Sequence, residues 1–130
     1  MKQITIEGKV YDIDCNSFTQ VQYKSFFKTG MIKDMQTIKE YLIKQTIVSK
    51  QITEVEPDLN EAQKLSKVAD YMSDDIDEYL IKVTQIAWIL IYSANEKIED
   101  YKTWLKSIKK FKIDADWIVE VTEFAVDCFC

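Results

Sequence analysis

The stretch Asp74–Ala94, with the sequence DDIDEYLIKVTQIAWILIYSA, decides the fold of this chain. Its apolar residues recur at the spacing of one helix face, at Ile76, Leu80, Val83, Ala87, Leu90 and Ile91. The stripe widens toward its end, because residues 86–92 carry no charge. A helix that is apolar on nearly every side must be covered by other helices or by a partner. The uncharged run of residues 86–92 is shorter than the roughly 20 consecutive apolar residues of a membrane span. We therefore expect a central helix with the rest of the chain packed around it.

The composition favours one helical domain. The chain has 130 residues, of which 47% are hydrophobic and 12% aromatic, and typical domains run about 100–150 residues. It contains only two glycines and one proline, so the many tight turns of a β-sandwich are disfavoured. We expect a compact, mainly α domain over residues 1–130, with about five to six helices and a short N-terminal β-hairpin.

The first thirty residues predict this hairpin and a short helix. Residues 3–13 alternate apolar and polar positions on either side of Gly8, which can take the positive φ of a tight turn. This pattern predicts a β-hairpin over about residues 3–13 that lies on the helices. We expect Thr19 to be the N-cap of the first helix, Phe18 its staple residue and Gly30 its C′ residue.

The middle of the chain predicts two helices before the central one. One is expected over about residues 31–52, where apolar side chains recur at helical spacing. Asp58 with Glu61 resembles a capping box after the chain's proline, and predicts the start of the next helix. We favour a break before the central helix, with Ser73 or Asp74 as its cap, although a continuous helix is the alternative.

The last part of the chain predicts two more helices. One covers about residues 98–108, and Asp114 is expected to cap the last one. Two apolar stripes adjoin on that last helix, with Trp117, Val121, Phe124 and Cys128 on one and Ile118, Ala125 and Phe129 on the other. Together they cover well over the roughly 100° of one packing face. We expect one stripe to pack on the central helix and the other to stay open, which gives the partner-contact candidates Trp117, Ile118, Val121, Phe124 and Phe129.

The charge and the residue types exclude several function classes. The net charge is −5, every basic residue is a lysine, and there is no histidine. An acidic chain without arginine disfavours nucleic-acid binding through phosphate neutralisation. The absence of histidine excludes a Ser-His-Asp triad, a Cys-His pair and a histidine-ligated metal. We predict a protein that is not an enzyme and that has no cofactor and no metal.

The cysteines indicate a reducing compartment. They are Cys15, Cys128 and Cys130, an odd number, and the first twelve residues lack the apolar core of a secretory signal. We therefore expect a cytoplasmic protein with free, reduced thiols. The alternative is a zinc site that joins all three, but a structural zinc takes about four ligands, typically from CxxC pairs.

Two charge clusters and the tryptophans each allow a second interpretation. The acids of residues 70–78 are explained as a solvated helix N-terminus, with metal binding or acid–base work by Asp74 and Glu78 as the alternative. The lysines of residues 106–112 suit the negative end of a helix dipole, with a nucleic-acid patch as the alternative. The three tryptophans favour a core role over partner contact.

Four stretches carry a resemblance to a known family. They are ITIEGKVYDID, NSFTQVQYKSFF, IAWILIYSANEKIEDYKTWLKSI and WIVEVTEFAVDCF, in this order over nearly the whole chain. In this respect the chain resembles the tail assembly chaperones of long-tailed (siphovirus-type) phages and prophages of Gram-positive bacteria. The resemblance rests on packing motifs and not on catalytic ones.

This resemblance implies a function in virion assembly. Such proteins bind the tape measure protein, keep its long hydrophobic helices soluble and assist tail tube polymerisation around it. They act in the cytoplasm of the bacterial host, are absent from the mature virion, and often have a longer frameshifted form. We expect protein partners and possible self-association, with no membrane and no nucleic acid. The alternatives are a small helical regulatory or nucleic-acid-associated adaptor and, third, an enzyme that uses the acids of residues 74–78.

Overall fold

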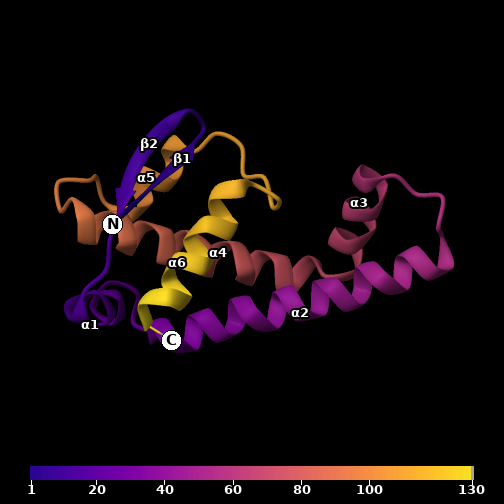
Figure 1. Cartoon of the computed structure of the whole chain (residues 1–130), viewed down its shortest axis with the longest axis horizontal. Coiled ribbons are helices and arrows are strands. Elements are labelled where there is room, and N and C mark those ends of the chain that lie inside the picture. The colour runs from indigo at the N-terminus through magenta and orange to yellow at the C-terminus, as the bar shows by residue number, and fades with distance from the viewer. Residues whose placement is uncertain (130) are drawn as a thin grey trace.

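The computed structural model describes residues 1–129, and it is mainly helical with one short antiparallel hairpin. Six helices and two strands lie in this part of the chain (Figure 1), in the order β1 (Lys2–Ile6), β2 (Lys9–Ile13), α1 (Ser17–Phe27), α2 (Met31–Val55), α3 (Glu61–Tyr71), α4 (Ser73–Ala94), α5 (Tyr101–Ser107) and α6 (Asp116–Phe129). This confirms the predicted fold class of several helices with an N-terminal β-hairpin.

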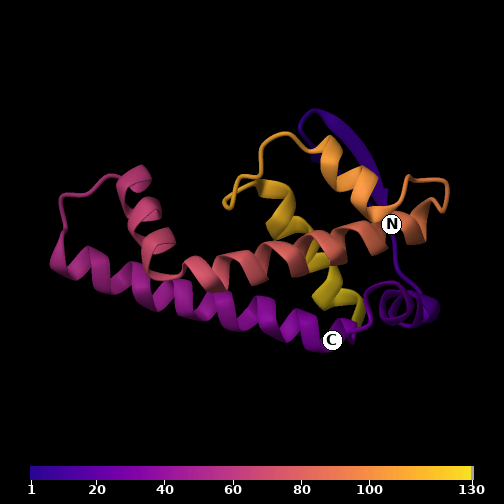
Figure 2. The same ribbon diagram turned by 180° about the vertical axis from the view of Figure 1, so that it is seen from behind.

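Helix α4 is the centre of the molecule, as its sequence predicts. Every residue from Ile86 to Ile91 is at most 3% exposed. Helix α4 contacts α1, α2, α3, α5, α6 and β2. Figures 1 and 2 show α2 running beside α4 along the long axis, while α6 crosses α4 and ends beside the first turns of α2. The apolar run therefore needs no partner to cover it, because this chain's own elements do so.

The hairpin packs on the helices at one side of α4. Ile4 of β1 pairs with Tyr11 of β2, and the turn residues Glu7 and Gly8 have φ values of 50° and 81°. Positive φ at both turn positions matches the right-handed twist of a two-residue hairpin turn. Strand β1 contacts α6 and β2 contacts α4, so the hairpin covers the face of α6 that points away from α2.

The predicted caps of α1 are wrong. Its N-cap is Asn16, whose side chain accepts a hydrogen bond from the Phe18 backbone N–H at 2.8 Å. Thr19 is the N3 residue, and its hydroxyl accepts from the Asn16 N–H at 3.0 Å and pairs with the Ser93 hydroxyl of α4 at 2.9 Å. Phe18 is exposed and is not a staple. The left-handed residue that ends the helix is Lys28 (φ 65°), while Gly30 is the extended N-cap of α2.

The boundaries of α3 also differ from the prediction. Asn60 and Gln63 form its capping box, with the Gln63 N–H donating to the Asn60 side chain at 2.8 Å. Asp58 therefore lies in the loop and does not cap the helix. The predicted break before α4 is confirmed, but it falls at Met72 (φ −123°), and no side chain of Ser73 or Asp74 caps it.

The C-terminal helices begin slightly later than predicted. Asp100 caps α5, accepting a hydrogen bond from the Thr103 N–H at 2.7 Å. Helix α6 begins at Asp116 and not directly after Asp114, because a turn closed by the Ala115 N–H on the Lys112 carbonyl oxygen precedes it.

A disulfide joins Cys15 to Cys128, which are 113 residues apart in the sequence. The prediction of free thiols at these two positions is therefore wrong. They meet because the last turn of α6 returns to the segment that leads into α1 (Figure 1). Cys130 lies outside the described residues.

Candidate protein-binding groove

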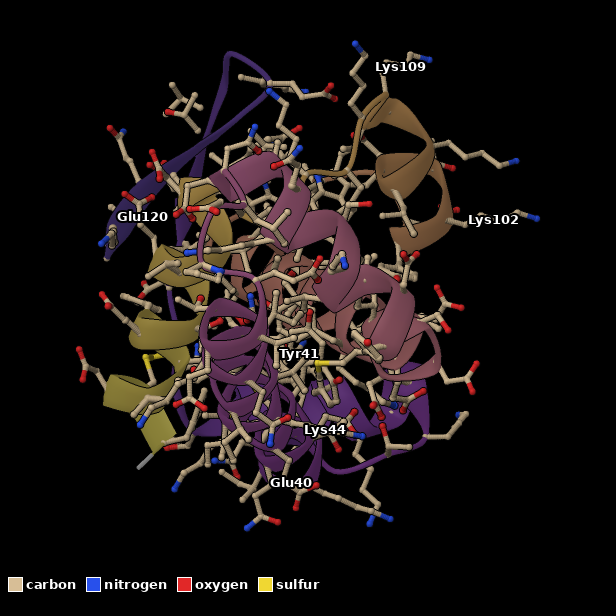
Figure 3. The ribbon with its side chains drawn as sticks, turned by 90° about the vertical axis from the view of Figure 1, so that its right-hand side faces the viewer. Glu40, Tyr41, Lys44, Lys102, Lys109 and Glu120 are labelled. Atoms are coloured by element: carbon tan, nitrogen blue, oxygen red, sulfur yellow. A yellow bond between two sulfur atoms is a disulfide. The ribbon has the colours of Figure 1, made fainter. Side chains whose placement is uncertain are left out.

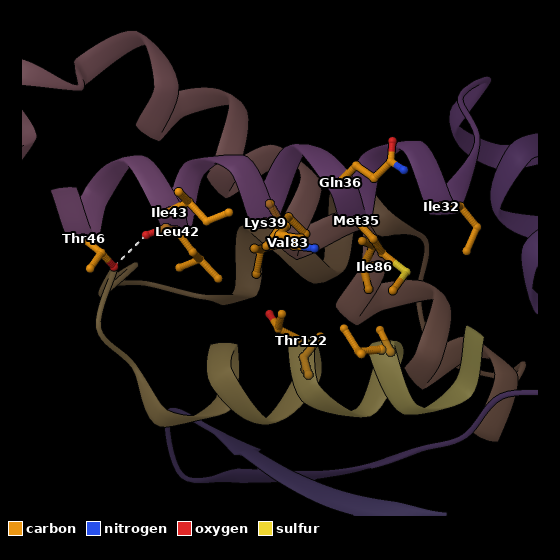
Figure 4. A pocket seen from close by; sticks show the side chains of 14 residues that line it. Ile32, Met35, Gln36, Lys39, Leu42, Ile43, Thr46, Val83, Ile86 and Thr122 are labelled. Carbon is orange, nitrogen blue, oxygen red and sulfur yellow. Dashed lines mark hydrogen bonds between the residues drawn. The ribbon is translucent and has the colours of Figure 1, made fainter. Parts of the chain in front are cut away.

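An apolar groove lies between α2 and α6, with α4 beneath it. We name it the α2–α6 groove. It has a volume of about 570 Å³. Its lining consists of Ile32, Met35, Gln36, Ile38, Lys39, Leu42, Ile43 and Thr46 of α2, Val83 and Ile86 of α4, and Val121, Thr122, Ala125 and Val126 of α6. In Figure 4 the side chains of Met35 and Leu42 point from α2 toward Thr122 on α6.

The α2 wall of the groove is a mixed helix face, with isoleucines between polar residues, that the rest of the chain leaves open. Residues 32, 36, 39, 43 and 46 share this face, because side chains three or four positions apart lie above one another on a helix. Ile32 is 38% exposed and Ile43 is 53% exposed. The wall extends over fifteen residues from Ile32 to Thr46, and the fourteen steps between them span about 21 Å at 1.5 Å per residue.

The floor of the groove and most of its α6 wall are buried. Val83 and Ile86 of α4 are 0% and 1% exposed, and Val121 and Ala125 of α6 are each 1% exposed. Val126 stands at the rim, where it is 44% exposed. A partner side chain that enters the groove would therefore meet a preformed apolar surface, which lowers the entropy cost of binding.

The groove offers few free polar groups. The hydroxyl of Thr46 donates to the Leu42 carbonyl oxygen at 2.9 Å, and that of Thr122 donates to the Ile118 carbonyl oxygen at 2.8 Å. Both hydroxyls are thus used within their own helices. The remaining polar side chains of the lining are Gln36 and Lys39, so the groove suits an apolar ligand with a polar edge.

The structure buries both stripes of α6, so the prediction that one of them stays open is wrong. Trp117, Ile118 and Val121 are 7%, 2% and 1% exposed, and Phe124 and Phe129 are half-buried against the core. Both stripes find partners because α6 lies between β1 on one side and α4 with α2 on the other. Of the five predicted contact residues, Val121 alone lines the α2–α6 groove.

The tryptophans belong to the core, as predicted. Trp88 and Trp104 are 3% and 0% exposed. The indole N–H of Trp88 donates to the Glu99 carbonyl oxygen at 3.0 Å, and its ring stacks on Tyr92 with a centroid distance of 5.1 Å. Phe26 contacts the same two rings edge-on, so α1 is held on α4 by aromatic packing.

The two charge clusters are used in contacts within this chain. Asp75 pairs with Lys44 of α2 at 2.6 Å, and Glu78 pairs with Lys82 at 3.8 Å. The Glu7 carboxylate accepts hydrogen bonds from the backbone N–H groups of Lys109 and Lys110 at 2.7 and 3.2 Å. The side chain of Lys109 points into solvent in Figure 3. The residues described here contain no group of three or more histidine, cysteine or acidic side chains placed to hold a metal.

A buried polar cluster, which the sequence analysis missed, fixes α2 against α1 and α4. Asp34 is 2% exposed and accepts hydrogen bonds from the hydroxyls of Tyr23 and Thr29, both at 2.6 Å. Lys82 of α4 lies 3.4 Å from the other carboxylate oxygen. Burial and then the Asp34 carboxylate raise the pKa of Tyr23 above its usual value. We call these four residues the Asp34 cluster.

The fold and the groove together define a helical domain with an apolar groove on its surface. Comparisons with family models, with curated proteins and with solved structures found no match to this chain. Within residues 1–129, none of the helices combines the length and the apolar character that crossing a membrane requires.

Proposed function

We propose that this chain binds an apolar helical segment of another protein in the α2–α6 groove and thereby keeps that segment from aggregating. The observation that carries this proposal is the apolar lining, in which Ile32, Ile43 and Val126 are exposed at the rim above the buried Val83 and Ile86. An amphipathic helix laid into such a groove buries its anchors at positions i, i+3, i+4 and i+7. The α2 wall has room for about four helical turns.

We further propose, on the resemblance in the sequence, that the chain is a tail assembly chaperone whose partner is the tape measure protein. A tape measure protein consists of long hydrophobic helices, and such helices need an apolar surface to cover them until the tail tube assembles. The α2–α6 groove supports this assignment because it offers that surface on a chain that covers its own core. The proposed setting is the cytoplasm of the bacterial host, with no retention in the mature virion; it rests on the resemblance alone, because the Cys15–Cys128 disulfide removes the argument from free thiols.

The adaptor that binds nucleic acid has less support. The lysines after α5 share their surface with Glu7, whose carboxylate is held by the backbone of Lys109 and Lys110. A carboxylate at this place weakens the attraction for phosphate groups. Binding to a protein helix therefore remains the function that the geometry supports best.

Co-expression with an aggregation-prone tape measure helix tests the proposal. We expect the unaltered chain to move the helix into the soluble fraction and Val126→Asp to abolish this effect, because the new carboxylate stands at the groove rim. Val119→Asp is the matched control, since Val119 lies on the same helix with 56% exposure but outside the lining. Equal solubilisation by both variants contradicts the proposed site, provided that both melt like the parent protein.

A further inference from the structure

A second hollow continues the α2–α6 groove toward α1. It has a volume of about 460 Å³ and is lined by Gln20, Val21, Lys24, Ser25, Gly30, Met31 and Ile32. Ile32 lines both hollows, so they meet at this side chain. In Figure 4 Ile32 stands at the end of the groove that faces α1. The apolar surface available to a partner is therefore longer than the α2 wall alone.

The second hollow has the same construction as the first. Its floor is Met31, which is 2% exposed, and its rim includes Val21, which is 60% exposed. A buried apolar floor with an exposed apolar rim is again the arrangement that an apolar side chain of a partner can fill.

The charge of the two linings is opposite to the charge of the whole chain. The net charge is −5, yet the charged side chains that line the two hollows are Lys24 and Lys39, and no acid lines either one. Both lysines are exposed, and neither forms an ion pair with another described residue, since the lysines in such pairs are Lys44, Lys64, Lys67 and Lys82. The two lysines are thus placed to meet charges on a ligand.

We infer that the two hollows form one docking surface for a helix of another protein whose apolar stripe is flanked by aspartate or glutamate. The inference rests on the proposed function and adds the chemistry of the partner. The apolar stripe fills the hollows on either side of Ile32, while the acidic flank meets Lys24 and Lys39. Complementary charge at a rim selects partners and speeds association more than it adds affinity.

Three synthetic helical peptides with one apolar stripe and different flanks test this inference. The flanking positions carry glutamate, glutamine or lysine, and binding is followed by fluorescence anisotropy at low and at high salt. We expect the glutamate peptide to bind about three- to tenfold more tightly than the glutamine peptide at low salt, and the difference to shrink at high salt. Lys24→Glu combined with Lys39→Glu should reverse the order, so that the lysine peptide binds best. The control is Lys102→Glu, because this exposed lysine of α5 points into solvent in Figure 3.

The outcomes separate this inference from the proposed function. If no peptide binds, the proposed function fails as well. If all three bind equally and the double variant changes nothing, groove binding stands and the acidic partner is excluded. Val21→Asp tests the second hollow. If this variant binds the peptide like the parent protein while Val126→Asp does not bind it, docking is restricted to the α2–α6 groove and the extended surface is overturned. If the protein is a dimer in solution and the groove variants dissociate it, a second copy of the chain occupies the groove, and the inference is overturned.

Discussion

Replacing a buried tyrosine by phenylalanine should destabilise the protein at Tyr23 and leave it unharmed at Tyr41. Tyr23 and Tyr41 are 0% and 4% exposed, and the substitution removes one oxygen atom at each. The Tyr23 hydroxyl donates to the Asp34 carboxylate at 2.6 Å. Within the described residues, the buried Tyr41 hydroxyl has no hydrogen-bond partner. The two positions thus differ in what the hydroxyl contacts and hardly at all in burial.

The expected magnitudes follow from these contacts. A hydrogen bond to a charged group contributes about 1.5–3 kcal/mol to stability, so Tyr23→Phe should lower the free energy of unfolding by about 2 kcal/mol. The carboxylate of Asp34 keeps Thr29 and Lys82 as partners, which prevents a larger loss. At Tyr41 the substitution relieves a buried hydroxyl and keeps the ring stacked on Tyr79 at 4.1 Å. Tyr41→Phe should therefore change stability by less than about 0.5 kcal/mol or increase it.

Thermal melting followed by circular dichroism measures both variants. For a domain of this length, 1 kcal/mol corresponds to about 4 °C in Tm. We expect a decrease of about 8 °C for Tyr23→Phe and a change below about 2 °C for Tyr41→Phe. Equal decreases for the two variants, or a decrease below about 3 °C for Tyr23→Phe, would refute the role assigned to the Asp34 cluster.

Three further predictions concern stability. Burial raises the pKa of Tyr23, and burial followed by the nearby Tyr41 raises the pKa of Tyr79 to about 12. Both phenols ionise near pH 10 in the unfolded chain and stay protonated in the folded one. The free energy of unfolding should therefore be unaffected below about pH 10 and fall above it by about 1.4 kcal/mol per pH unit for each tyrosine. Urea unfolding at pH 9 to 11 measures this slope, and a flat profile contradicts it. Cys128→Ser should lower the free energy of unfolding by about 2–5 kcal/mol, because the disulfide closes a loop of most of the chain; a dithiol reductant should lower the Tm of the parent protein but not of the variant. Asn60→Ala should cost about 1 kcal/mol through loss of the α3 cap, while Asp58→Ala should cost almost nothing, and equal losses in urea titrations would contradict the cap assignment.

The sequence predicts the elements well because each is encoded locally. The run from Ile86 to Tyr92 admits only a covered helix, and the structure gives α4 the bounds Ser73–Ala94. The alternation around Gly8 likewise suffices for the hairpin. The caps fail for a different reason, since several residues near each helix start can cap it. Contact with another element decides among them, as when Thr19 is buried against Ser93 of α4.

The groove and the disulfide could not be predicted because both depend on how distant elements meet. The α2 wall alternates Ile32 and Ile43 with Gln36 and Lys39, so its pattern is that of an ordinary solvated helix face. Whether such a face borders a hollow depends on where α6 crosses α4. The pairing of Cys15 with Cys128 depends on the same crossing, and no spacing within the sequence encodes it.

The arrangement of α2 explains how the chain keeps an apolar surface open without losing its own stability. Asp34, Ile38 and Tyr41 form the buried face of this helix, where the Asp34 cluster and the ring stacking with Tyr79 fix it to α4. The exposed groove wall from Ile32 to Ile43 lies on nearly the opposite face, because successive helix positions are rotated by about 100°. Ile38 takes part in both the packing and the groove lining, while Asp34 and Tyr41 serve anchoring alone and the exposed residues of the wall serve the groove alone. A charged substitution at the wall should consequently leave the fold intact, and the loss of binding that it causes reports on the groove itself.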